Sequence, residues 1–337
     1  MSNSNTDFLA DILKPFQPQL PIDELILEVN KLFHEFEAKD YDKIHPEIHQ
    51  QLPPIWREMI DRATSVAKVP QWRILDFGCG TGFEAEQLIK NLPSGSIAEL
   101  TCYDPSPEML AFCRTKISPL FPTATFCSDL NSASGAGQSY NLLVTNSLLH
   151  HLPDPIETIV NLGDLLTADA IWLAGHEPSS RFYKNAECLK LCNDFEREDN
   201  RQKYLSLSRY WAAIERAIGL KANPLNQAAA AAVERGLFNQ KPSKLAIDRI
   251  VDFHVAHSLD EAASGRGLDF EVMEQKFVDS WKLLWVKTYS FMGSHYDGEL
   301  PEKWSRLSND LAQSFPKDGA NFCTAWQRRD RSVAAGE

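Results

Sequence analysis

The chain has 337 residues, of which 43% are hydrophobic and 24% are charged. These are ordinary globular proportions, and they exclude a disordered or fibrous protein. A net charge of -12 opposes binding to nucleic acid or to an anionic membrane surface, so we expect neither as a partner. The length favours one α/β domain of roughly 200 residues that carries additions.

The N-terminal sequence MSNSNTDFLADILKPF has no basic segment followed by an apolar stretch, and no run of about eighteen apolar residues occurs. The sequence therefore predicts a cytoplasmic protein. The seven cysteines lie mostly in apolar surroundings, as expected of free thiols in a reducing compartment. Cys188 and Cys192 are one helical turn apart, which we interpret as a helix face rather than a metal site.

Two helices are predicted in the first 69 residues. Residues 22–36 carry apolar side chains with the spacing of an amphipathic helix. A second helix is predicted from Pro54 to about Ala67, because proline suits a first helical turn. Residues 41–53 contain prolines and polar residues, which predict a broken segment. We expect residues 1–69 to form a helical lid.

Residues 73–171 alternate short apolar runs with helical stretches, the pattern of a parallel sheet with crossover helices. The predicted strands are 73–77, 99–103, 123–127, 141–146 and 170–175, and the predicted helices are 82–92, 106–117 and 155–166.

Residues 177–265 break the alternation with mostly helical sequence, which predicts an insertion that covers a ligand site. After it, residues 270–277 and 321–329 are predicted as two more strands, on either side of a helix at 301–314. We therefore expect a sheet domain built from residues 70–176 and 266–330.

The sequence ILDFGCGTG places glycines between a strand and a helix, where the backbone can approach a ligand closely. Gly80, Gly82 and Ala85 satisfy the dinucleotide spacing, so glycine spacing alone leaves an NAD-dependent oxidoreductase open. The preceding Asp76 would repel a pyrophosphate but attract an ammonium or sulfonium group. Asp104 and Asp129 follow the next two strands, where their carboxylates could accept from ribose hydroxyls and from an adenine amino group. These features favour a nucleoside with a cationic tail.

Four successive motifs, ILDFGCGTG, YDPSPEML, SDL and YNLLVTNSLLHHLPD, resemble those of the class I S-adenosylmethionine-dependent methyltransferases that act on small molecules. The resemblance covers about residues 70–178, and NFCTAWQRR near the C-terminus is compatible with it. It implies a Rossmann-like, mostly parallel seven-stranded sheet with flanking helices. It also implies S-adenosyl-L-methionine as cofactor and S-adenosyl-L-homocysteine as product. Asn141 stands where the family often has an aspartate that supports structure, which leaves the expected activity unchanged.

The resemblance assigns cofactor contacts by position. The glycines Gly78, Gly80 and Gly82 lie under the methionine portion of the cofactor. Asp76 lies beside the amino group of that portion, and Asn146 lies at its border. Asp104 binds the ribose, Asp129 binds the adenine amino group, and Leu130 packs on the adenine ring.

Methyl transfer from a sulfonium is an in-line displacement, so a base is needed only for an acceptor whose proton has a high pKa. Histidines that follow the strands are the first candidates. The predicted catalytic residues are His150, His151, His176 and Glu177, and the predicted substrate contacts are Tyr41, His45, Tyr210 and His254. His254 and His257 lie three apart with no acidic partner at fixed spacing, so we predict no metal.

The predicted function is methyl transfer to a small molecule, either a secondary metabolite or an intermediate tethered to a carrier, with an oxygen acceptor favoured over nitrogen or carbon. No NPPY-type tetrapeptide follows the fourth strand, which opposes methylation of nucleic-acid bases. A protein methyltransferase, a catalytically silent interaction module that binds the cofactor, and an NAD-dependent oxidoreductase remain as alternatives.

Overall fold

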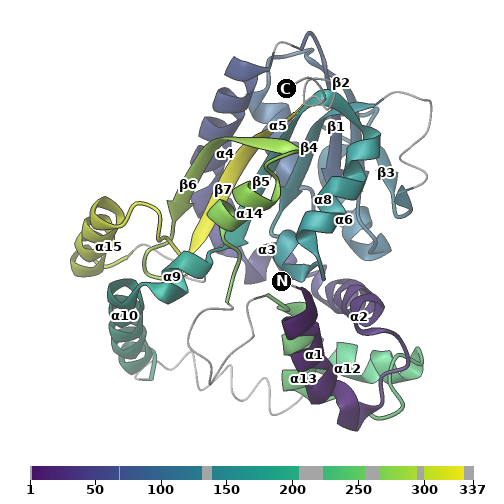
Figure 1. The fold of residues 1–337 in the computed structure, drawn as a ribbon, viewed down its shortest axis with the longest axis vertical. Helices are drawn as coiled ribbons and strands as arrows, with labels where there is room; N and C mark the ends of the chain where they lie inside the picture. Colours follow the sequence, from purple (N-terminus) through teal and green to yellow (C-terminus); the bar gives the residue numbers. More distant parts are fainter. Residues whose placement is uncertain are drawn as a thin grey trace.

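A seven-stranded sheet forms the centre of the computed structural model, which describes residues 2–67, 69–130, 139–204, 223–254, 266–293 and 300–329 (Figure 1). The strand order is β3-β2-β1-β4-β5-β7-β6, and β7 alone runs in the direction opposite to the other six strands. The predicted Rossmann-like, mostly parallel sheet is confirmed. The strands are β1 (Trp72–Phe77), β2 (Ile97–Tyr103), β3 (Thr125–Cys127), β4 (Tyr140–Asn146), β5 (Leu166–Pro178), β6 (Trp281–Tyr289) and β7 (Asn321–Arg328).

Helices cover both faces of the sheet, because successive strand residues point to opposite sides. In β1, Ile74 joins a core with helices α4 (Pro46–Val66), α5 (Phe83–Asn91) and α6 (Pro107–Ile117). The next residue, Leu75, joins the opposite core with α8 (Pro155–Asn161) and α14 (Phe270–Lys276). Every residue of β4 is buried, as expected for a central strand covered on both faces. A short 3-10 turn, η3 (Leu162–Leu165), completes the predicted helix at 155–166.

The prediction of a strand at residues 270–277 was wrong, because these residues form helix α14. Asp269 caps the helix by accepting a hydrogen bond from the amide of Glu271. Phe270, Met273 and Phe277 have helical spacing, and all three are buried against the sheet. The sixth strand is instead β6, whose Trp281 packs on Trp172 of β5.

The prediction that residues 41–53 are broken was also wrong. They form a short helix, α3 (Tyr41–Ile44), and the first part of α4, which begins at Pro46 and continues through Pro53 and Pro54. Each internal proline removes a backbone hydrogen bond. Buried α4 side chains such as Leu52 and Trp56 pack against the sheet, and this tertiary packing stabilises the helix despite the two prolines.

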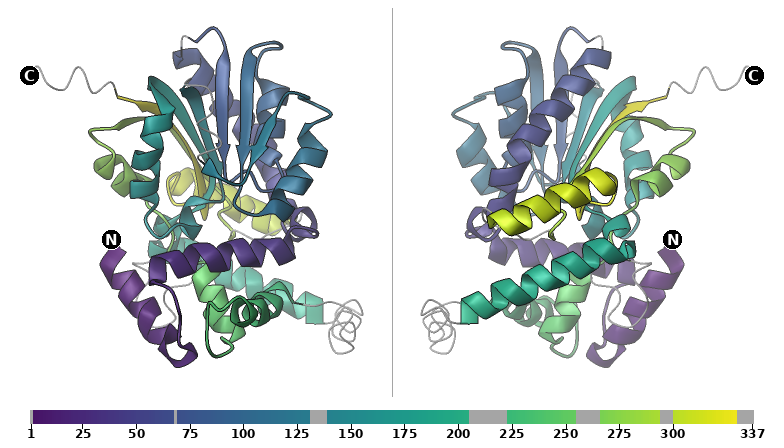
Figure 2. Two further views of the ribbon diagram at one scale, coloured as in Figure 1. Left: turned by 90° about the vertical axis from the view of Figure 1, so that its right-hand side faces the viewer. Right: turned by 90° about the vertical axis from the view of Figure 1, so that its left-hand side faces the viewer.

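Four helices form a separate layer at one end of the sheet (Figures 1 and 2). These are α1 (Ser2–Leu13), α2 (Ile22–Glu37), α12 (Pro224–Glu234) and α13 (Lys244–Val251), which share one hydrophobic core. Part of the predicted lid and part of the predicted insertion are thus packed together. The division of the chain into lid, sheet domain and insertion stays a prediction.

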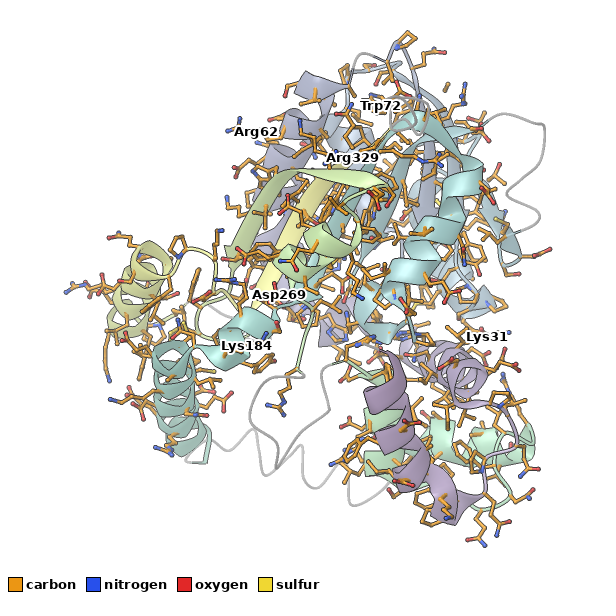
Figure 3. The ribbon with its side chains drawn as sticks, in the orientation of Figure 1. Lys31, Arg62, Trp72, Lys184, Asp269 and Arg329 are labelled. Atoms are coloured by element: carbon orange, nitrogen blue, oxygen red, sulfur yellow. The ribbon has the colours of Figure 1, made fainter. Side chains whose placement is uncertain are left out.

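The remaining helices lie together at the lower left of Figure 1. They are α9 (Ser180–Lys184), α10 (Ala186–Tyr204) and α15 (Glu302–Ser314). Cys188 and Cys192 are buried on one face of α10 in a core shared with α15, as predicted. Nζ of Lys184 lies 3.6 Å from Oδ2 of Asp269, and this ion pair links α9 to the start of α14 (both residues are labelled in Figure 3). Among the described helices, none has the length and apolar character that crossing a bilayer requires.

Candidate cofactor and acceptor site

The glycine turn follows β1 at the point where the strand order reverses, which is where open α/β sheets bind ligands. Gly78, Gly80 and Gly82 have φ angles of 78°, 48° and 87°, a backbone region that favours glycine. Space is also limiting, since a Cβ at Gly82 would lie 2.9 Å from Sγ of Cys113 and one at Gly78 would lie 2.7 Å from Leu148. The φ angles, together with these contacts at Gly78 and Gly82, explain why glycines occupy the turn.

A pocket lies over this turn, between the sheet and the segment from α2 to α4. Its cavity volume is about 60 Å³, far below the roughly 300–1,000 Å³ of small-molecule sites. A nucleoside ligand can therefore enter only if the covering side chains move. The pocket is lined by His34, Tyr41, Asp42, Ile48, His49, Gly78, Cys79, Gly80, Thr81, Phe83, Glu84, Asp104, Met109, Asn146, Ser147, Leu148 and His151.

Asp104, at the end of β2, holds the glycine turn in place. One carboxylate oxygen accepts from the amide of Gly80 at 2.9 Å, and the other accepts from the amide of Ser106 at 2.9 Å. Each oxygen keeps a second lone pair, so the carboxylate can still accept from ligand hydroxyls. The structure thus places Asp104 in the pocket, as the ribose assignment requires.

Asp76 and Asn146 carry buried acceptors that lack partners. Neither carboxylate oxygen of Asp76, nor Oδ1 of Asn146, makes a hydrogen bond within the described residues. Burial, followed by the charges of Glu84, Cys113 and Asp104, raises the pKa of Asp76 well above its usual value. Asn146 faces the pocket, and Gly175 of β5 leaves room for its amide because a Cβ there would collide with Oδ1. A positively charged donor at the turn would suit these acceptors.

Glu84 adds a third carboxyl group to the same region. It lies in the first turn of α5, is buried, and lines the pocket. Burial raises its pKa to about 8. The lining includes Asp42, Glu84 and Asp104 but contains neither lysine nor arginine among the described residues, so the pocket favours a cation over a phosphate.

The two residues assigned to the adenine lie away from this pocket. Asp129 is exposed after β3, and Leu130 is partly buried against the core on the α8 face. Neither lines the cavity, and the chain that follows them, residues 131–138, is outside the described ranges. Their contacts with an adenine ring stay a prediction.

Asp42 fastens α3 to the glycine turn. Its carboxylate accepts from the hydroxyl of Thr81 at 2.6 Å, and it pairs with Lys116 at 3.0 Å and His49 at 3.3 Å. Although burial acts in the opposite direction, the hydrogen bonds from His49, Thr81 and Lys116 lower the pKa of Asp42 well below its usual range. We call this set of contacts the Asp42 latch, because it joins the segment above the pocket to α6 and to the turn below it.

Tyr41 and His45 are both predicted substrate contacts, but only Tyr41 lines the pocket. Tyr41 lines the pocket, and burial with the neighbouring charge of Glu37 raises its pKa well above the usual value, so its phenol is neutral. His45 lies outside the lining, between Glu37 at 3.6 Å and Glu47 at 3.1 Å. Burial opposes protonation of His45, but hydrogen bonds to both carboxylates raise its pKa to about 9. His45 therefore carries a charge that stabilises the bend between α3 and α4.

Glu177, at the end of β5, anchors the loop that follows β4. Its fully buried carboxylate accepts from the amides of Leu148 and Leu149 at 3.0 and 2.9 Å, and from the amide of His150 at 3.3 Å. It also lies 2.8 Å from Nδ1 of His150. Neither Glu177 nor His150 lines the pocket. Their contacts fix the 3-10 turn η2 (Leu149–His151), which carries His151.

His151 is the predicted catalytic residue that the structure places in the pocket. Its Nδ1 lies 2.6 Å from the carbonyl of Val251, which can only accept, so Nδ1 carries the proton and Nε2 keeps its lone pair. Burial and the nearby rings of His150 and His34 lower the pKa of His151 well below 6.5. The side chain is therefore a neutral imidazole with Nε2 available as an acceptor.

Two further predicted residues, His176 and His254, do not line the pocket. Nδ1 of His176 lies 2.6 Å from the hydroxyl oxygen of Tyr289. His254 lies 2.8 Å from the carbonyl of Leu152, and burial lowers its pKa to about 4. Tyr210 is outside the described residues.

Comparisons with known proteins found similarities to methyltransferases. The sequence model of a family described as a methyltransferase domain matches residues 75–172, the range from β1 and the glycine turn to the middle of β5. The chain therefore contains a methyltransferase domain within these residues. It is 29% identical over 141 residues to a malonyl-[acyl-carrier protein] O-methyltransferase of Bacillus cereus, covering 41% of this chain and 48% of that protein.

Two further similarities extend over different shares of the chain. The chain is 34% identical over 114 residues to a release factor glutamine methyltransferase of Bacteroides thetaiotaomicron, covering 33% of this chain and 40% of that protein. One similar solved structure is the plantazolicin methyltransferase BpumL in complex with a triazolic desmethylPZN analog and SAH. Its TM-score is 0.43 and its sequence identity is 17%, and the match covers 92% of this chain and 98% of that chain. The chain spans less than half the length of the curated relatives described here.

Several residues of the methyltransferase domain's pocket were missed from the sequence. Glu84 stands next to the glycine motif, where its first-turn position was a usable signal. His34, Asp42 and His49 come from helices remote in sequence from the glycine turn, and their spacing alone carried no signal that they meet it.

We expect Asp42→Ala to loosen the Asp42 latch. The half-exposed ion pairs contribute about 0.5–1 kcal/mol, so amide hydrogen exchange over residues 37–49 should rise about 2- to 5-fold, while β1 and β4 stay unchanged. Asp40→Ala is the matched control, because Asp40 pairs only with the exposed Lys43 among the described ion pairs. Equal exchange in the two variants would contradict the latch.

Glu84 predicts a specific dependence of stability on pH. Its pKa is about 8 in the folded protein and 4.5 when solvated, so between these values only the folded protein keeps the proton. Stability should therefore fall as pH rises from 4.5 to 8, by up to about 1.4 kcal/mol per pH unit from this group. Denaturant titrations of Glu84→Gln should show a smaller decline over that window. Parallel pH profiles for the variant and the parent protein would reject the assignment.

Proposed function

We propose that this protein transfers a methyl group from S-adenosyl-L-methionine to an oxygen atom of a small molecule, either free or tethered to a carrier. The observation that carries the proposal is the acidic pocket over the glycine turn. Three carboxyl groups line it without a lysine or arginine among the described residues, and the unpartnered Asp76 lies beside it. A nucleoside with a cationic tail suits this charge, whereas the pyrophosphate of NAD does not.

The residues present fit the cofactor. Asp104 would accept from the ribose hydroxyls, and the backbone of Gly78 and Gly80 would lie under the methionine portion. Asp76 and Asn146 would receive its ammonium group, which would satisfy acceptors that otherwise lack partners. When bound, S-adenosyl-L-methionine supplies a methyl group on a positively charged sulfur.

His151 is the residue best placed to act on the acceptor. A neutral imidazole that lines a cofactor pocket and keeps the lone pair of Nε2 can take the proton of a hydroxyl acceptor. The carbonyl of Val251 orients the ring by holding Nδ1–H, and Glu177 positions the loop from below. We assign Glu177 and His150 to positioning of His151 rather than to contact with the acceptor. Val251 lies in α13, so the helical layer also sets the catalytic tautomer.

The relatives support an oxygen acceptor and leave one alternative. The name malonyl-[acyl-carrier protein] O-methyltransferase describes methyl transfer to oxygen on a substrate that is bound to a carrier protein. An oxygen acceptor agrees with the role proposed for His151. The similarity to a release factor glutamine methyltransferase favours a protein as the second candidate substrate.

Labelled methyl transfer tests the proposed function. The protein is incubated with methyl-labelled S-adenosyl-L-methionine and a cell extract, which is then separated into small-molecule, protein and nucleic-acid fractions. We expect label in the small-molecule fraction, with a carrier-tethered product released from the protein fraction by thioester cleavage. Cleavage-resistant label in protein would support the second candidate, and cofactor binding without transfer would favour a catalytically silent module.

Asp104→Ala provides the blank for that experiment. Loss of the carboxylate leaves ribose hydroxyls unpaired and releases the amide of Gly80, so cofactor affinity should fall by about 1–3 kcal/mol, or roughly 5- to 150-fold. Asp40→Ala, on the exposed side of α3, should bind normally. Unchanged affinity in Asp104→Ala would remove the ribose assignment.

His151→Gln should separate binding from chemistry. We expect the rate of methyl transfer to fall about 10²- to 10⁴-fold while cofactor affinity stays within a factor of about two. Because the pKa of His151 is held well below 6.5, the parent enzyme should keep its rate at neutral pH and lose it only in acid. His49→Gln is the control, since His49 lines the same pocket but pairs with Asp42. A near-normal rate in His151→Gln would exclude His151 as the base.

A further inference from the structure

We propose that Cys79, Cys102 and Cys113 form a binding site for a thiophilic d10 metal ion beneath the glycine turn. All three are free thiols and are buried. Their sulfur atoms lie within 4.8 Å of one another, although the residues come from three separate segments of the chain. The site is distinct from the proposed chemistry, because no role in cofactor binding or methyl transfer falls to these thiols.

The fold itself brings the thiols together. Cys79 lies between two glycines of the turn, and its amide donates to the carbonyl of Tyr103 at 2.9 Å, which fixes the turn beside β2. Cys102 belongs to β2 and Cys113 to α6, which packs on the same face of the sheet. Gly82 permits the close approach, because a Cβ there would press on Sγ of Cys113.

The spacing of the sulfur atoms matches a three-coordinate thiolate site. Metal–sulfur bonds of about 2.3 Å place three sulfurs in a plane roughly 4 Å apart. The distances between the three sulfur atoms are at most 4.8 Å, so each needs to shorten by less than about 1 Å when a metal ion binds. Thiolate ligands select ions such as Cu⁺ and Zn²⁺, and they reject Mg²⁺ and Ca²⁺, which require oxygen. Cd²⁺ belongs to the same thiophilic class as Zn²⁺.

The thiols lie in a buried core that also contains one carboxyl group. Leu100 and Ile117 belong to the same buried core and shield the thiols from water. Asp76 is the register partner of Cys102 across β1 and β2, so both side chains leave the same face of the sheet. The carboxyl group of Asp76 is fully buried and has no hydrogen-bond partner among the described residues.

Cys79 connects this site to the cofactor pocket, since it also lines the cavity above the turn. Contraction of the sulfurs around a metal ion would pull Cys79 and the adjacent amides of Gly78 and Gly80 away from their present positions. Metal binding should therefore weaken cofactor binding, and bound cofactor should weaken metal binding by the same factor. Each thiol that becomes a ligand releases its proton to solvent, so uptake should be accompanied by acidification.

Titration of the reduced, full-length protein with Cd²⁺ tests the site without any cofactor. We expect ultraviolet sulfur-to-cadmium charge-transfer absorption that saturates at one ion per chain, and displacement of Zn²⁺ by Cd²⁺, which is the softer ion. Cys102→Ser and Cys113→Ser should each bind Cd²⁺ at least about tenfold more weakly, because two sulfurs remain. The Cys188→Ser/Cys192→Ser double variant is the control, since it removes the buried pair on α10.

Two results would overturn the proposal. One is Cd²⁺ affinity in Cys102→Ser and Cys113→Ser equal to that of the parent protein. The other is loss of the absorption in the Cys188→Ser/Cys192→Ser control. Should either single variant fail to fold, X-ray absorption of the Cd²⁺-loaded parent protein decides, since three sulfur neighbours support the site and an oxygen shell rejects it.

Discussion

One carboxylate, that of Asp104, joins the three parts of the cofactor site. It accepts from the amide of Gly80 in the glycine turn and from the amide of Ser106 at the start of α6. The turn, the end of β2 and the first turn of α6 are therefore held in one arrangement. The glycines supply the backbone freedom, but the buried carboxylate selects the conformation that leaves their amides at the edge of the sheet.

The electrostatics of the pocket follow from this arrangement. Asp76, Glu84 and Asp104 come close together because β1, β2 and α5 meet at the turn, and each has a raised pKa whose leading cause is burial. Bringing like charges together out of water is costly unless a cation accompanies them. The Asp42 latch then covers the acidic site with α3, so ligand entry requires the covering segment to move.

The proposed catalytic residue, His151, depends on contacts with segments remote from it in sequence. His151 is oriented by Val251, one hundred residues later, while Glu177 holds the preceding loop through three backbone amides. The helical layer that contains α13 is built jointly from the N-terminal helices and from α12 and α13. A change in this layer should therefore affect the orientation of His151 as well as access to the pocket.

Local chemistry explains which features the sequence could predict. The glycine turn and Asp104 were predictable because a strand, its turn and the next helix are encoded within a few residues. Helix α14 was not, since a short run containing Phe270, Met273 and Phe277 also fits a buried strand. Asp42 and His34 reach the pocket only through tertiary packing of α2 and α3, and the anchoring by Glu177 depends on partners 27 to 29 residues away.

Calorimetric titration of the protein with S-adenosyl-L-methionine, and separately with NADH, tests the acidic cofactor pocket most directly. We expect saturable binding of S-adenosyl-L-methionine at one site per chain, with proton release at neutral pH as Glu84 ionises beside the cationic ligand. We expect no measurable binding of NADH under the same conditions. Tighter binding of NADH, or binding of S-adenosyl-L-methionine that Asp104→Ala leaves unchanged, would contradict the proposed site.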